Sequence, residues 1–88
     1  MTAISGLAVE LYEAFRTYEM RVGVGPSSRE LMQALGWTSR ARFTKQMRAL
    51  IDAGMIVEIS ASSSRSKGWR SRRLDRQMKA AGLIEVTP

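Results

Sequence analysis

The chain contains no cysteine and no histidine among its 88 residues. Without cysteine there is no disulfide, thiolate metal site or thiol nucleophile, and without histidine the commonest general base of enzymes is missing. The side chains left for catalysis show no convergent pattern, and no phosphate loop or metal-ligand set is visible. We therefore expect a protein that is not an enzyme and that needs no metal or other cofactor.

Long hydrophobic runs are missing as well. The apolar stretches fall far short of the roughly 18 residues that a membrane-spanning helix needs, so no membrane partner is expected. The N-terminal stretch MTAISGLAVELYEAF has acidic residues and lacks the basic start of a secretory signal. Together with the lack of cysteine, this composition predicts a small globular protein of the cytoplasm.

Charge is unevenly distributed along the chain. The net charge is +6, but residues 1–39 carry three basic and four acidic side chains, whereas residues 40–79 carry eleven basic and three acidic ones. Basic charge gathered in one part of a chain favours a polyanionic partner. A solvated basic face that only keeps the protein soluble explains the same numbers.

Apolar side chains recur at intervals of three and four residues, which predicts a helix over about residues 3–20 and another over about residues 28–35. The second helix has a strong start, since the Ser27 hydroxyl and the Glu30 carboxylate can each cap the other's backbone amide. Gly36 is suited to end it.

A third helix is predicted over about residues 39–53, capped by Ser39 or Thr38 and followed by Gly54 in the left-handed conformation. One sector of its helical wheel is apolar: Phe43, Met47, Leu50 and Ile51. Lys45 and Arg48 fall on the opposite side, so the basic side chains are expected to face outward.

Two strands and a fourth helix complete the prediction. Residues 55–59 read as a strand, residues 61–68 as a flexible hairpin tip and residues 69–71 as the returning strand. A helix follows within residues 72–81, and residues 83–86 form either a short strand or a docked tail. The two tryptophans are interpreted as packing residues rather than as platforms for base stacking.

This order of elements predicts a winged helix-turn-helix fold, mainly α with a small β-hairpin. Its domain spans residues 1–71 and has a three-helix core plus the hairpin as the wing. Residues 72–88 form a C-terminal helix and tail that pack on the domain or on a partner subunit.

The sequence resembles the N-terminal DNA-binding domain of LexA-type repressors over about residues 4–70. The likeness rests on these stretches: Gly25-Pro26-Ser27-Ser28-Arg29-Glu30-Leu31, Ala34-Leu35-Gly36-Trp37-Thr38-Ser39, Met47-Arg48-Ala49-Leu50 and Ala53-Gly54-Met55-Ile56. It departs from the family pattern at Ser27, where a second proline is usual, and at Gln46, where a histidine is usual. It implies a binding mode but no operator sequence, and it does not extend to the self-cleaving protease domain of those repressors.

Pattern and resemblance together predict a sequence-selective double-stranded DNA-binding protein, expected to be a small bacterial or phage transcriptional regulator. The third helix would lie in the major groove, while the start of the second helix and the wing would hold the backbone. The recognition-helix candidates are Ser39, Arg40, Arg42, Thr44, Lys45 and Arg48. The candidates at the second helix start are Ser27, Ser28 and Arg29, and those in the wing are Arg65, Lys67 and Arg70.

Other interpretations stay open. Capping alone explains the serines, and an exposed hairpin explains the basic wing. A homodimer on a two-fold DNA site is compatible with a domain of this size. The alternative function is a winged-helix protein-interaction module, for example a phage factor that binds a host protein without specific DNA binding.

Overall fold

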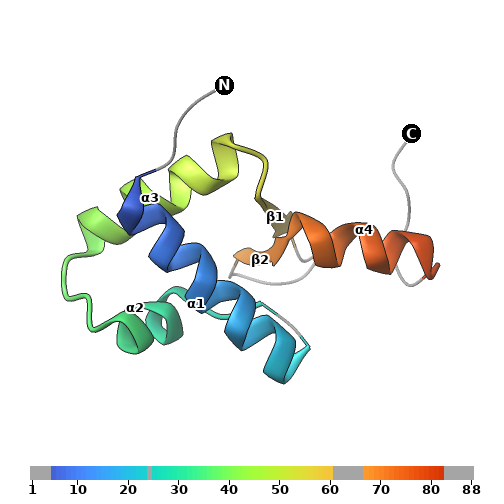
Figure 1. The fold of residues 1–88 in the computed structure, drawn as a ribbon, viewed down its shortest axis with the longest axis horizontal. Helices are drawn as coiled ribbons and strands as arrows, with labels where there is room; N and C mark the ends of the chain where they lie inside the picture. The colour runs from blue at the N-terminus through green and yellow to red at the C-terminus, as the bar shows by residue number, and fades with distance from the viewer. Residues whose placement is uncertain (1–4, 24, 61–66, 83–88) are drawn as a thin grey trace.

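The computed structural model describes residues 5–23, 25–60 and 67–82, which form four helices and a two-stranded antiparallel sheet (Figure 1). The elements in chain order are α1 (Gly6–Val22), α2 (Ser28–Leu35), α3 (Arg40–Asp52), β1 (Ile56–Ser60), β2 (Lys67–Ser71) and α4 (Arg72–Ala80). The prediction of a mainly helical chain with one small hairpin is therefore confirmed.

The first helix begins later than residue 3, because Ser5 caps it. Ser5 is extended, and its hydroxyl accepts a hydrogen bond from the Ala8 amide at 3.1 Å. At its other end α1 runs to Val22, two residues beyond the predicted limit of residue 20, before Gly23 ends it.

The second helix has the predicted bounds and the predicted capping box. The Ser27 hydroxyl accepts from the Glu30 amide at 3.2 Å, while the Ser27 amide donates to the Glu30 carboxylate at 3.0 Å. Gly36 ends the helix at φ 68°, a left-handed conformation that glycine adopts without steric cost. Only four residues, Gly36 to Ser39, separate α2 from α3, so the two helices are joined by a tight turn.

The third helix is capped by Ser39, whose hydroxyl accepts from the Arg42 amide at 3.2 Å. Its apolar side turns inward to join α1, α2 and β1 in a single core. The buried hydrophobic residues are Ala8, Leu11, Phe15, Leu31, Phe43, Met47, Leu50 and Ile56. Because α1 contacts α2, α3 and β2, it is the helix around which the other elements pack.

The hairpin is longer than predicted on its returning strand. Strand β2 begins at Lys67 rather than at residue 69, since Ser60 pairs with Lys67 and Ile59 with Gly68. Strand β1 is shifted by one residue toward the C-terminus. Residues 61–66 of the predicted tip lie outside the described part of the chain.

Gly25 lies against the hairpin so closely that no side chain fits there. A Cβ atom at this position would meet the backbone oxygen of Trp69 at 2.0 Å. The loop before α2 is therefore pressed onto β2, and this contact fixes the hairpin relative to the helices.

The fourth helix confirms the prediction for residues 72–81 and extends away from the three-helix core beside the hairpin (Figure 1). Ser71 caps it by accepting from the Leu74 amide at 3.1 Å. The Arg72 side chain donates through Nε to the Gly54 carbonyl at 2.5 Å. The predicted strand or tail at residues 83–86 lies outside the described residues.

Within the described residues, no helix is both long and apolar enough to cross a membrane.

Candidate nucleic-acid interface

The six candidate residues of the third helix all lie on the outer surface of α3 or at its cap. Ser39, Arg40, Arg42, Thr44, Lys45 and Arg48 are exposed, whereas Phe43, Met47 and Leu50 between them are buried. The wheel therefore predicted the two faces of α3 correctly. The helix presents four positive charges to solvent.

These charges have few acidic partners on the protein itself. Arg48 lies 4.0 Å from Asp52, but both side chains are about two-thirds exposed, at 66% and 69%. An exposed pair of this kind contributes little, roughly 0.3–0.5 kcal/mol, and is easily exchanged for another anion. Within the described part of the chain, Arg40, Arg42 and Lys45 form no salt bridge. Their charge remains available to an external ligand.

The start of α2 is held rigidly by its capping box and by Tyr18 of α1. The Tyr18 hydroxyl donates to the second carboxylate oxygen of Glu30. Hydrogen bonds from Tyr18 and then from Ser27 lower the pKa of Glu30, and the same contact raises the pKa of Tyr18. Glu30 therefore stays ionised and ties α2 to α1.

The candidates at this helix start have different surroundings. Ser27 is exposed, but its hydroxyl is already used in the cap. Ser28 is half-buried and faces a groove beside α3, and Arg29 is exposed. Ser28 and Arg29 are thus accessible next to the free amides of the first helical turn, where an anion is favoured.

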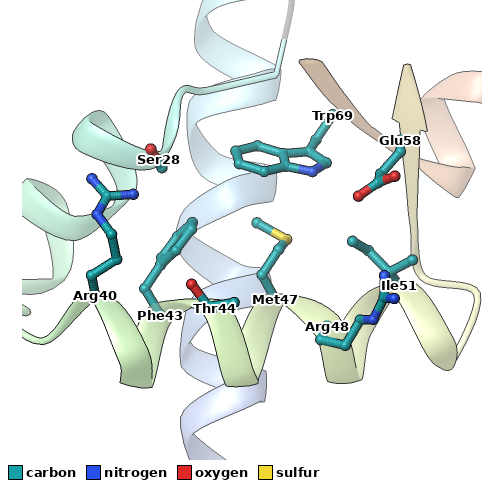
Figure 2. A pocket seen from close by; sticks show the side chains of 9 residues that line it. All are labelled: Ser28, Arg40, Phe43, Thr44, Met47, Arg48, Ile51, Glu58 and Trp69. Atoms are coloured by element: carbon teal, nitrogen blue, oxygen red, sulfur yellow. The ribbon is translucent and has the colours of Figure 1, made fainter. Parts of the chain in front are cut away.

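A groove runs along the side of α3 that faces the hairpin (Figure 2). Phe43, Met47 and Trp69 form its apolar floor, and the rings of Phe43 and Trp69 pack at a tilt with centroids 6.0 Å apart. Arg40 points toward Ser28 at one end, while Arg48 and Glu58 lie at the other (Figure 2). The structure thus brings the start of α2, one side of α3 and the hairpin together.

The wing prediction requires a correction at Arg70. This side chain is only 16% exposed and donates to the Asp75 carboxylate at 2.8 Å, so it holds α4 against the hairpin instead of extending into solvent. Arg65 lies outside the described residues. Lys67 begins β2, whereas the sequence predicted it to lie in the tip of the hairpin.

The basic residues of α4 also divide into two kinds. Lys79 pairs with Asp75 at 3.0 Å, and Arg72 binds the Gly54 carbonyl. Arg73 and Arg76 are exposed. The charge of the C-terminal segment is therefore partly used to fasten α4 to the domain.

Sequence reasoning missed several residues that shape this surface. Glu58 and Trp69 line the groove because they are cross-strand partners in the hairpin, a register that the sequence did not give. Gln46 is buried and accepts from the Ser5 hydroxyl at 2.7 Å, which joins α3 to the start of α1. Its signal was its spacing, three residues after Phe43 and four before Leu50, which puts it beside the buried face of α3.

Among the described residues, no three carboxylates gather closely enough to hold a metal ion. No protein family profile matches the chain, and no curated protein matches it.

Proposed function

We propose that this chain is a winged helix-turn-helix protein that binds double-stranded DNA with sequence selectivity and acts as a small transcriptional regulator in the cytoplasm of a bacterium or in its phage. In this proposal α2 and α3 are the helix-turn-helix, α3 is the recognition helix, and the β1–β2 hairpin is the wing. The resemblance to LexA-type repressors in the sequence supports the same assignment.

One observation carries the proposal: the exposed cationic side of α3. The helix projects Arg40, Arg42, Lys45 and Arg48 from a well-packed core, and a four-residue turn joins it to α2, which packs on the same helix α1. A helix carried in this way has the dimensions to enter the major groove, where arginine and lysine pair with guanine.

The groove separates the exposed residues of α3 into two sets with different proposed contacts. Arg40, Thr44 and Arg48 are four residues apart and line the side toward the hairpin, where the sugar–phosphate strand between the two grooves of DNA would pass. Arg42 and Lys45 lie outside the groove lining and are exposed, which suits contact with base edges. Ser28 and Arg29 at the start of α2 would hold a neighbouring phosphate.

The direct test measures binding of the full chain to a fluorescent random-sequence duplex at low salt. The fluorescence anisotropy of the duplex reports the bound fraction. Lys45→Glu and Arg48→Glu should each weaken binding at least tenfold, because each converts a phosphate or base contact into a repulsion. Arg21→Glu is the matched control, since it makes the same change of charge on an exposed residue in the last turn of α1. It should change the affinity by less than threefold.

Equal losses in all three variants, or no binding by the wild type, would reject the proposal and favour a protein-interaction module. Selection of bound duplexes from a random pool then supplies the target site. A recovered motif with two-fold symmetry indicates a dimer.

A further inference from the structure

The groove between α3 and the hairpin has properties that a strand of DNA does not require. Its volume is about 410 Å³, within the roughly 300–1,000 Å³ typical of small-molecule sites. Its floor is apolar and includes two aromatic rings, those of Phe43 and Trp69. A flat apolar body therefore fits the floor better than a sugar does.

The charged residues around this floor favour a ligand with one negative charge. Arg40 and Arg48 supply two positive charges and Glu58 one negative charge, so the lining has a net charge of +1. Arg40 stands at the end near Ser28, where the positive end of α2 adds to its field (Figure 2). A second negative charge on the ligand would meet Glu58 at the opposite end.

Trp69 adds a polar group to the apolar floor. Its Nε1 atom is buried and has no hydrogen-bond partner among the described residues. Buried donors are nearly always paired, so the signal of this unpaired N–H should be sensitive to a ligand bound beside it. Figure 2 shows the nitrogen on the edge of the indole that faces Met47 and Glu58.

We propose that this groove binds a small monocarboxylate with a flat apolar body. The apolar body lies on Phe43, Met47 and Trp69, and the carboxylate lies at Arg40. Binding itself does not rest on the proposed function. If the chain binds DNA, the ligand occupies the side of α3 that faces the hairpin and therefore competes with the duplex.

The test uses naphthalene-2-carboxylate and the full chain labelled with ¹⁵N, without DNA. Two indole N–H signals are expected, and the Trp37→Phe variant assigns them. The Trp69 signal should shift saturably with a Kd near or below about 1 mM, as expected for a ligand of this size. The Trp37 signal should stay in place, because Trp37 does not line the groove.

Charge selectivity is tested with naphthalene-2-methanol, which has the same ring but no charge and should bind at least fivefold more weakly. Arg40→Gln should weaken carboxylate binding about tenfold, the loss expected for a charge-assisted hydrogen bond. Arg76→Gln, an exposed change on α4, should leave it unchanged. Thr44→Phe fills the groove from the exposed side of α3 and should abolish binding even if Arg40→Gln fails to fold.

Absence of a saturable shift, equal binding of the alcohol and the acid, or equal weakening by Arg40→Gln and Arg76→Gln would overturn the proposal. Each of these results is independent of DNA binding. If the chain binds the carboxylate but no duplex, the groove site is supported and the proposed function is rejected. If it binds the duplex but no carboxylate, only the groove site is rejected.

Discussion

At the scale of single residues, Glu19 is the most deeply buried acidic side chain described, with 2% of its surface exposed. It accepts hydrogen bonds from the Ser71 amide at 2.9 Å and the Ser71 hydroxyl at 2.5 Å, and it pairs with Arg16 at 2.5 Å. A buried carboxylate is tolerated only when it is paired and hydrogen-bonded in this way. Glu19 therefore fastens α1 to the junction of β2 and α4.

Replacement of Glu19 by alanine should lower the free energy of unfolding by about 2–4 kcal/mol, because it leaves the Ser71 amide and the Arg16 guanidinium without their partner. Urea unfolding measures the change. Glu13→Ala, an exposed change on the same helix, should stay within about 0.5 kcal/mol of wild type. A similar small effect at Glu19 would contradict the structural role.

Asp75 links the pH dependence of stability to the attachment of α4. Burial raises the pKa of its carboxyl, but hydrogen bonds and charges from Lys79 and Arg70 outweigh burial and hold the pKa below its usual value. The ionised form thus stabilises the fold above the unfolded pKa of about 3.9, and this contribution is lost as the pH falls through the lower folded value.

Asp75→Asn should therefore be less stable than wild type by about 1–3 kcal/mol at neutral pH, because Arg70 and Lys79 lose a charged partner. Below about pH 4 the difference should shrink, since Asp75 becomes neutral in the wild type as well. Urea midpoints measured at a series of pH values check this. A difference that stays constant down to about pH 2 would mean that Asp75 does not carry the effect.

The sequence predicted single residues well where helical periodicity decided their position. The exposed basic residues of α3 are the main example, since spacing alone separates them from Phe43 and Met47. It failed at Arg70, because the exposure of that arginine depends on Asp75 in the next element. Glu19 was also missed, although it lies four residues after Phe15 on the same buried face of α1.

At the scale of elements, local capping chemistry explains why α2, α3 and α4 begin where they do. Ser27, Ser39 and Ser71 each accept from the amide three residues ahead. The first two caps are visible in the sequence because glycine or proline precedes them closely. The third follows directly from a strand, so no loop marks it, and the sequence did not identify it.

The position of the hairpin relative to the helices could not be read from the sequence. It depends on the contact of Gly25 with the Trp69 backbone and on the packing of the Trp69 ring against Phe43. Both are contacts between residues far apart in the chain. The groove beside α3 was therefore not foreseen, because it exists only once the hairpin is docked.

Gly25→Ala should destabilise the protein by about 3 kcal/mol or more, since the new Cβ would meet a backbone oxygen that cannot move aside without shifting β2. Gly6→Ala is the control, because no atom lies within 4 Å of a Cβ at that position. Thermal unfolding followed by circular dichroism compares the two variants. Equal melting temperatures would show that the hairpin is not seated on Gly25.

At the scale of the whole molecule, the fold leaves the four basic residues of α3 exposed while it uses several other basic residues in internal pairs. Arg16, Arg70 and Lys79 are paired with acids that hold elements together. Among the described residues, Arg40, Arg42 and Lys45 of α3 form no such pair. The sequence did not show which basic residues are paired, because it gave only the total excess of basic over acidic side chains in residues 40–79.

Salt dependence of duplex binding tests the central claim most directly. If the cationic side of α3, the α2 start and the wing neutralise about four to six phosphates, log K should fall against log salt with a slope of about −4 to −5. Arg48→Gln, which removes a proposed phosphate contact, should reduce the magnitude of that slope by about one. A slope near zero in the wild type, or an unchanged slope in Arg48→Gln, would contradict a duplex held by α3.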